Sequence, residues 1–347
     1  MVGGGTPDTT VPSLWNGDIQ WFTPTEVGHQ KYVSKSARTI TQLGLQKSST
    51  KKLPAGSILL SSRATIGECS IAQRECTTNQ GFQNLIPKND TNNEFLYYLA
   101  QTKKYHFIKY ASGSTFLEIS NSEIRKTKCT VPGTEEQTQI AAFLSALDDR
   151  IAVQNKIISK YETLIKGLCD MIFPSIEGSI LPLKAIVNIE KGQQINGMSL
   201  AKTGKYYYLN GGIAPSGYID DYNTSEETIS ISEGGNSCGF VSYNLQKFWS
   251  GGHCYTLKIM AEQCRSKYLF FYLKYKEKDI MQLRVGSGLP NIQKKSLENF
   301  NVILPNYKKQ CFVERIFEVV TAKKEIENAL LERFQSQKKF LLSKMFI

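Results

Sequence analysis

The second half of this 347-residue chain repeats its first half at a constant offset of 173 positions. The register holds at the matched pairs Gly113/Gly286, Ile119/Ile292, Pro132/Pro305, Gln137/Gln310, Leu168/Leu341 and Phe173/Phe346. Solenoid repeats are only about 20–50 residues long, so this offset indicates duplication of a whole domain with its connector. The sequence therefore predicts two similar modules that contact two similar but non-identical targets.

Each repeat begins with a β-rich part that is broken by clusters of Gly, Pro, Asn and Ser. Short apolar runs at 57–60 and 83–86 predict strands joined by loops. A helix is predicted at 93–101 with a counterpart at 268–273, and we expect the aromatic residues of both to pack in cores. The second module, from about 180 to 304, keeps this pattern but has different loops, where recognition usually lies.

A long helix is predicted to follow the first module. Thr134 as N-cap with Gln137 three residues later predicts a capping box. From Ile140 to Ile172 apolar residues keep a 4-3 spacing with one polar position at Gln154, which is typical of a coiled coil. A helix over 134–173 would be about 60 Å long.

A second long helix is predicted from 310 to 347, with a looser and more cationic seam. The predicted seam positions are Val313, Ile316, Val320, Ile326, Leu330, Phe334, Leu341 and Met345. We expect the two helices to pack antiparallel, with one module at each end. The predicted fold class is thus α+β: two loop-rich α/β modules separated by two long antiparallel coiled-coil helices, with pseudo-two-fold symmetry.

The formal net charge of +11 favours nucleic acid, an anionic membrane surface or acidic proteins as partners, with a solvated basic surface as the alternative. The sequence has neither a run of about 18 apolar residues that would predict a membrane span nor the pattern of a signal peptide at its N-terminus. We therefore expect a cytoplasmic protein. The eight cysteines and three histidines lack zinc spacing, so free thiols and no metal site are expected.

Several segments resemble the specificity subunit of type I restriction–modification systems. In the first module they are Gly3–Pro7, Leu14–Pro24 and Ser61–Gly67, and in the second they are Lys191–Gln194, Asn210–Tyr218, Ser232–Ser237 and Trp249–Tyr255. Together with the duplicated helices that follow Pro132 and Pro305, the resemblance covers essentially the whole chain.

The resemblance implies that each module is a target-recognition domain that reads one half of a split, asymmetric site in double-stranded DNA. The helices would act as a spacer and dock two methyltransferase subunits, to which restriction subunits can be added. The chain itself would be non-catalytic and hold no cofactor, since S-adenosylmethionine, ATP and magnesium would bind to its partners. The implied segments are target-recognition domains at 1–132 and 175–305 and spacer helices at 133–174 and 306–347.

The two modules differ in the strand that leads into each of them. A strand is predicted at 181–190 before Lys191, whereas only two residues precede the matching Gly3. We therefore expect module 1 to lack its leading strand.

The candidates for DNA contact are Lys31, Lys35, Lys47, Arg63, Thr65, Lys191, Gln193, Asn210, Ser216, Asn236 and Ser237. The lysines are expected at phosphates, where binding depends on salt. Arg63 has the geometry to fork onto guanine, with support of its own loop as the alternative. The Asn and Ser residues lie in Gly-rich segments, where turn formation is the alternative. The candidates for partner binding are Gln137, Gln154 and Gln310.

The two alternative classes of function are an enzyme and a coiled-coil scaffold. An enzyme is disfavoured because the chain lacks a Gly-rich phosphate loop and a methyltransferase tetrapeptide, and Asp148 and Asp149 are expected to form ion pairs on the helix surface. A coiled-coil scaffold that binds only proteins would explain the long helices. It would not explain two diverged, loop-rich modules with net positive charge.

Overall fold

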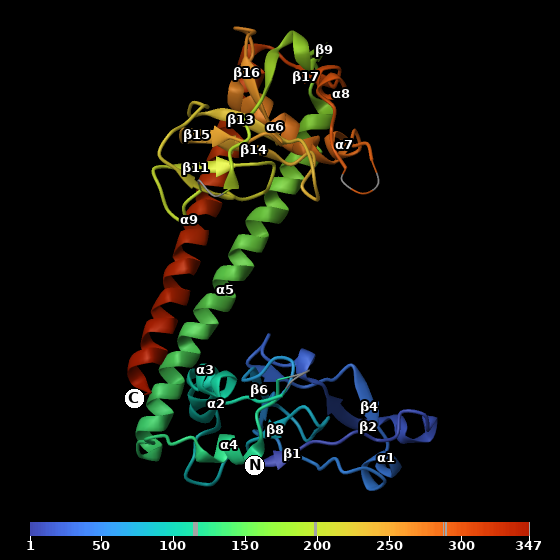
Figure 1. The fold of residues 1–347 in the computed structure, drawn as a ribbon, viewed down its shortest axis with the longest axis vertical. Helices are drawn as coiled ribbons and strands as arrows, with labels where there is room; N and C mark the ends of the chain where they lie inside the picture. Colours follow the sequence, from blue (N-terminus) through green and yellow to red (C-terminus); the bar gives the residue numbers. More distant parts are fainter. Residues whose placement is uncertain (114–116, 198–199, 287, 289, 347) are drawn as a thin grey trace. The chain divides into compact units, whose positions relative to one another are not determined.

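The computed structural model describes the whole chain except residues 114–116, 198–199, 287, 289 and 347 (Figure 1). The chain divides into two compact units: unit 1 comprises Met1–Asn155 and Ala329–Ile347, and unit 2 comprises Lys156–Asn328. Each unit contains one β-rich module and a part of both long helices. The units divide within the helices, whereas the segment boundaries predicted from the sequence follow the helix ends. Those boundaries stay a prediction.

The strands of unit 1 are short and form small sheets. They are β1 (Val2–Gly3), β2 (Trp15–Phe22), β3 (Tyr32–Val33), β4 (Arg38–Ile40), β5 (Ile58–Leu60), β6 (Cys69–Ala72), β7 (Thr77–Thr78) and β8 (Gln83–Asn84). Among the described residues, β2 lies between β4 and β7, β6 lies between β3 and β5, and β1 pairs with β8. The short helices are α1 (Gln42–Gln46), α2 (Asn93–Thr102), α3 (Lys104–Lys109) and α4 (Asn121–Lys126).

Unit 2 is built around a larger antiparallel sheet of order β10-β16-β13-β14. Its strands are β9 (Ser179–Pro182), β10 (Val187–Lys191), β11 (Tyr206–Leu209), β12 (Gly217–Ile219), β13 (Thr228–Ser232), β14 (Val241–Asn244), β15 (Phe248–Ser250), β16 (Cys254–Ile259) and β17 (Asn301–Leu304). Its short helices are α6 (Ser266–Tyr275), α7 (Glu277–Met281) and α8 (Lys294–Glu298). A second sheet has the order β12-β11-β15, and β9 pairs with β17.

The predicted strands at 57–60 and 83–86 correspond to β5 and β8, and the helices predicted at 93–101 and 268–273 are α2 and α6. The strand expected at 181–190 forms in two pieces, β9 and β10. Its counterpart in module 1 is the two-residue β1. The strand β17, which pairs with β9, has no counterpart in module 1, because residues 128–131 form no strand.

The long helices are α5 (Thr134–Ile172) and α9 (Tyr307–Met345), as predicted. In unit 1, Leu144 near the start of α5 shares a hydrophobic cluster with Phe346, which follows the end of α9. In unit 2, Phe173 just after α5 shares a cluster with Phe317 near the start of α9. Within each unit the two helices are therefore antiparallel neighbours (Figure 1).

The predicted seam of α5 is confirmed, since its positions from Ile140 to Ile172 are all buried or half-buried. The seam predicted for α9 is wrong at two positions: Ile326 is 66% exposed, and Leu330 is also exposed. The six-residue step from Val320 to Ile326 leaves the 4-3 register. Continuing that register from Phe317 instead leads to Leu331, which is half-buried.

The predicted capping box at Thr134 is also wrong. Thr134 is already helical, and the Gln137 N–H donates to Gly133 O at 2.9 Å. Gly133 therefore occupies the position before the first helical residue, where glycine is well tolerated. The Gln137 side chain reaches back to Pro132 O instead.

The eight cysteines are free, as expected. Burial raises the pKa of Cys69, Cys76 and Cys264 to about 12, so these thiols are protonated and unreactive at neutral pH. No cluster of residues suited to a metal ion occurs in the described part of the chain. Nor is any described helix long and apolar enough to cross a membrane.

Candidate nucleic-acid interface

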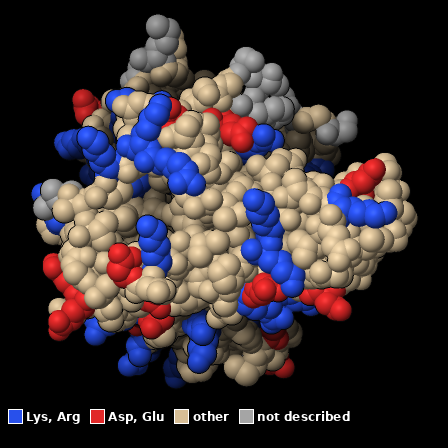
Figure 2. Space-filling model, turned by 90° about the horizontal axis from the view of Figure 1, so that it is seen from below, with Lys and Arg blue, Asp and Glu red and all other residues tan. Residues whose placement is uncertain are grey.

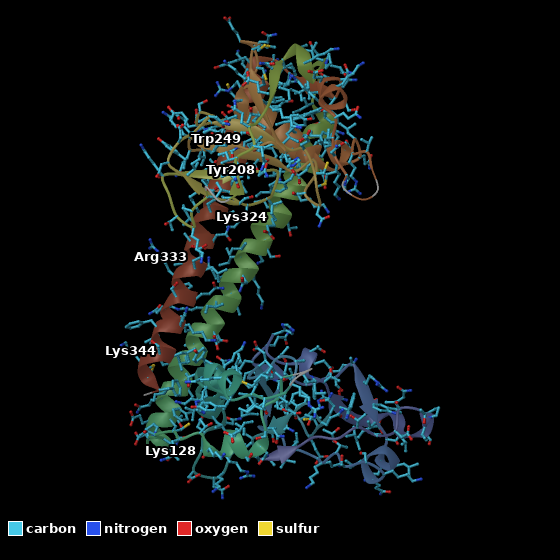
Figure 3. The ribbon with its side chains drawn as sticks, viewed as in Figure 1. Lys128, Tyr208, Trp249, Lys324, Arg333 and Lys344 are labelled. Carbon is cyan, nitrogen blue, oxygen red and sulfur yellow. The ribbon has the colours of Figure 1, made fainter. Side chains whose placement is uncertain are left out.

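Three segments of module 2 meet at the turn between β15 and β16. The Gln193 N–H donates to Ser250 O at 2.8 Å, and the His253 N–H donates to Asn210 Oδ1 at 3.1 Å. Trp249, on the strand beside Tyr208, donates its indole N–H to Gln193 O at 2.9 Å (Figure 3). The fold thus brings the predicted residues Gln193 and Asn210, which are distant in sequence, to one turn.

The predicted Ser237 belongs to the same region, since its hydroxyl donates to Gly211 O at 2.6 Å. Asn236 beside it is exposed, and so is Ser216. Gly211 has a φ of +77°, a left-handed conformation that favours glycine. A Cβ at Gly211 would also lie 2.4 Å from His253 O. The close packing of the two turns therefore depends on this glycine.

A buried carboxylate lies under this turn. Glu233 is 8% exposed, and its Oε1 atom lies 2.6 Å from Lys191 Nζ and accepts a 3.0 Å hydrogen bond from the Tyr255 hydroxyl. Its Oε2 atom lies 3.4 Å from His253 Nδ1. Burial, together with the hydrogen bond to Glu233, raises the pKa of Tyr255 above its usual range. The phenol therefore stays a neutral donor to the carboxylate.

Sequence reasoning placed Lys191 in this site but missed Glu233 and His253. Both lie in segments that carried the family resemblance, Ser232–Ser237 and Trp249–Tyr255. The sequence offers no signal for a shared role of these two side chains, because neither forms a metal or catalytic spacing. Only the fold shows that they are neighbours.

In module 1 the predicted Arg63 is held by an acidic partner, since its Nε atom lies 2.7 Å from Glu118 Oε2. The Thr65 hydroxyl is 3.2 Å from Pro24 O. Between the two, Ala64 has a φ of +58°, which costs free energy for any residue with a Cβ. This strained loop keeps Arg63 half-exposed. Both interpretations of Arg63, contact with a guanine and support of the loop, stay open predictions.

Lys31, which the sequence predicts at a phosphate, has an acidic and an aromatic neighbour within unit 1. Its side chain is 13% exposed, and its ammonium group lies 2.7 Å from Glu94 Oε2 and 5.0 Å from the centre of the Tyr98 ring. Burial raises the pKa of Glu94, but hydrogen bonds from Lys31, Ser145 and Tyr32 outweigh it and leave this pKa below its usual value. These contacts suit a structural role in unit 1, and the phosphate contact of Lys31 stays a prediction.

The other two lysines predicted in module 1, Lys35 and Lys47, are exposed. On the face drawn in Figure 2, Lys and Arg side chains are scattered among acidic and neutral ones. Three of the predicted cations, Lys31, Arg63 and Lys191, have carboxylate partners within 2.7 Å. Such pairing fixes the direction of a side chain, which suits directed contacts more than a diffuse basic surface.

Gln137, a predicted partner-binding residue, is 2% exposed. Its Oε1 atom accepts from the Asn92 N–H at 2.9 Å, and its Nε2 atom donates to Asp90 O at 3.2 Å and to Pro132 O at 2.9 Å. Both amide N–H groups and the oxygen are thus used inside unit 1. The geometry indicates that Gln137 fixes the start of α5 to the loop before α2.

Gln310 repeats this arrangement in unit 2, as the duplicated sequence leads one to expect. It is 1% exposed, accepts from the Arg265 N–H at 2.9 Å, and donates to Gln263 O and Pro305 O, each at 2.9 Å. The third predicted partner-binding glutamine, Gln154, is also buried on α5. A structural role therefore suits all three glutamines better than direct contact with a partner.

The family described as Type I restriction modification DNA specificity domain matches this chain twice, over residues 2–163 and 179–335. The chain belongs to this family. It is a non-catalytic specificity subunit, and both the enzyme and the scaffold alternatives are disfavoured by the match.

Similar proteins are named as specificity subunits of type I restriction enzymes. The chain is 30% identical to the Type I restriction enzyme MjaIX specificity subunit of Methanocaldococcus jannaschii, over 88% of this chain and 80% of that protein. It is 22% identical to the EcoprrI specificity subunit of Escherichia coli, over 91% and 83%. In fold, the specificity subunit resembles the crystal structure of a type I restriction–modification S subunit from M. genitalium, with a TM-score of 0.68, 19% identity and coverage of 100% and 99%.

Proposed function

We propose that this specificity subunit reads a split, asymmetric sequence in double-stranded DNA, with module 1 (1–132) and module 2 (175–305) each reading one half. The observation that carries the proposal is the duplication, in which two modules keep common framework residues while their loops differ. Membership of a DNA specificity family supports it. Two modules that face similar DNA with different side chains would select two different half-sites.

The proposed contacts to DNA are of two chemical kinds, those to phosphates and those to base edges. Exposed lysines such as Lys35, Lys47 and Lys191 would contact phosphates and set the register of the protein on the duplex. Side chains on the loops would contact base edges and select the sequence. The proposed loop residues are Arg63, Thr65, Gln193, Asn210, Ser216, Asn236 and Ser237.

The spacer helices, at 133–174 and 306–347, would dock two methyltransferase subunits, and restriction subunits would join that core. One similar solved structure, at 16% identity and a TM-score of 0.61, is described in terms of complex assembly of the type I R-M system. S-adenosylmethionine, ATP and magnesium would bind to those partners. Since the target is the DNA of the host and of invading elements, the complex would act in the cytoplasm.

The test is to co-express the chain with its methyltransferase subunits and to map methylated adenines in the host genome. We expect one motif with two different half-sites at a fixed gap, since each module is a separate reader. A palindrome or a single half-motif would contradict the two-reader proposal. Absence of methylation from a complex that assembles would refute DNA recognition by this chain.

Lengthening both helices is expected to lengthen the gap between the half-sites. One heptad inserted after Gln154 and one after Asn328 would keep the 4-3 register of both helices while adding about 10 Å of helix. The same methylation map would then show both half-sites unchanged but further apart. An unchanged gap would show that the helices do not set the spacing.

A further inference from the structure

The turn before β16 is held by backbone hydrogen bonds that fix the position of His253. We call this set of hydrogen bonds the backbone frame. The Glu233 N–H donates to His253 O at 2.9 Å, and the Ile292 N–H donates to Glu233 O at 2.8 Å. The Tyr255 hydroxyl, which has a single proton, closes the frame, since its oxygen lies within hydrogen-bond distance of both Glu233 Oε1, at 3.0 Å, and Ile292 O, at 3.1 Å. The backbone of His253 is therefore tied to the core of module 2, so its position is defined.

Module 1 contains the same frame with different side chains. There the Ser62 N–H donates to Gly81 O at 2.8 Å, and the Ile119 N–H donates to Ser62 O at 3.1 Å. Ile119 is the duplicate of Ile292. Ser62 thus corresponds to Glu233 and Gly81 corresponds to His253. The duplication preserved the hydrogen bonds of the backbone and exchanged the two side chains, as expected where the modules differ in specificity.

The two side chains differ sharply in exposure. The His253 side chain is 63% exposed, whereas that of Glu233 is 10% exposed. Glu233 Oε2 is inaccessible to solvent and has no hydrogen-bond partner in the described residues, although it faces His253 Nδ1 at 3.4 Å. A buried carboxylate oxygen strongly favours a donor. His253 Nδ1 is the group placed to supply one.

This arrangement assigns a chemical role to each imidazole nitrogen. The Glu233 carboxylate lies 3.4 Å from His253 Nδ1 and would favour a proton on that atom. In the neutral ring with that proton, Nε2 is a hydrogen-bond acceptor. In the major groove the donors on base edges are the exocyclic amino groups, N6 of adenine and N4 of cytosine. Lys191 balances the charge of Glu233, so the pair adds no net negative charge against DNA.

We propose that His253 contacts the exocyclic amino group of one base in the half-site of module 2, and that Glu233 is the positioning residue that fixes its imidazole. This rests on the proposed function of the chain. His253 lies in the turn that also gathers Gln193 and Asn210, so it belongs to the same surface as the residues proposed to contact DNA.

The test compares methylation motifs of the complex with its methyltransferase subunits for the wild type, His253→Ala and the control His29→Ala, an exposed histidine of module 1. We expect His253→Ala to relax one adenine or cytosine position in one half-site, with the preference at that position falling about tenfold. The control should leave that half-site unchanged, because it lies in the other module.

Two variants of Glu233 separate positioning from folding. Glu233→Gln retains an oxygen that can accept from Nδ1, so it should keep most of the base preference. Glu233→Ala should relax the same position as His253→Ala, even though His253 is still present. The melting temperature of each complex is measured alongside. If Glu233→Ala fails to fold, the comparison of Glu233→Gln with His253→Ala carries the test.

Several results would overturn the proposal. An unchanged motif for His253→Ala would remove His253 from base recognition. Uniformly weaker binding of all duplexes, with a shallower salt dependence, would make it a phosphate contact. If relaxation fell at a different position for Glu233→Ala, Glu233 would not act through His253. A wild-type complex that methylates no split motif would instead refute the proposed function itself, and the inference with it.

Discussion

Replacing Phe173 with alanine is expected to lower the free energy of unfolding of unit 2 by about 4 kcal/mol. The ring is buried in the core, where its centre lies 4.9 Å from that of Tyr275 and 5.6 Å from that of Phe317, both in stacked arrangements. The substitution removes these contacts and leaves a cavity where α5, α6 and α9 meet. Because stacked rings from other elements hold the walls apart, the site has little freedom to collapse.

Urea unfolding of the full chain, followed by hydrogen exchange in α6, measures this effect. The control is Phe143→Ala, a 51% exposed phenylalanine on α5, which should change stability by less than about 0.5 kcal/mol. Equal effects of the two substitutions would show that Phe173 does not anchor the end of α5.

Replacing Gln310 with alanine is expected to cost unit 2 about 2 kcal/mol. The substitution removes three hydrogen bonds and leaves the Arg265 N–H, Gln263 O and Pro305 O without this partner. Polar groups that lose a partner while shielded from water cost more than the average hydrogen bond contributes. Gln137→Ala should have a similar effect on unit 1, because its amide makes the same three kinds of contact.

The control for Gln310→Ala is Gln337→Ala, an exposed glutamine on the same helix α9. Thermal unfolding should separate the two variants by several degrees. If Gln310→Ala leaves stability unchanged but weakens assembly with the methyltransferase subunit, the result would support the partner-binding role predicted from the sequence. The two results exclude each other, so the measurement decides between them.

The long helices and the seam of α5 could be predicted because their signal is local and periodic. A regular 4-3 pattern indicates which face of α5 is buried without knowledge of its neighbours. The register of α9 could not be predicted as well, because charged residues interrupt its seam and leave Ile326 and Leu330 as plausible but wrong positions. Packing against α5 decides which face turns inward.

The candidate site was less predictable because its chemistry depends on contacts between distant segments. A lysine such as Lys31 in a basic chain predicts a phosphate contact. Only the fold reveals the carboxylate of Glu94 beside it. The pairing of Glu233 with His253 spans two loops that no periodicity connects. The repeat of Gln137 as Gln310 predicts that the two residues share a role. Repetition alone does not show whether their contacts lie on the surface or in the core.

The division of the chain into its units has a consequence for synthesis on the ribosome. Unit 2 is one continuous segment, Lys156–Asn328, whereas unit 1 needs Ala329–Ile347 to complete its core. The Phe346 ring, 5.1 Å from that of Phe95, is synthesised only after the whole of unit 2. The first module to be synthesised is therefore the last that can fold fully. Until then its part of α5 exposes apolar residues that α9 later covers, so nascent chains should need protection from aggregation.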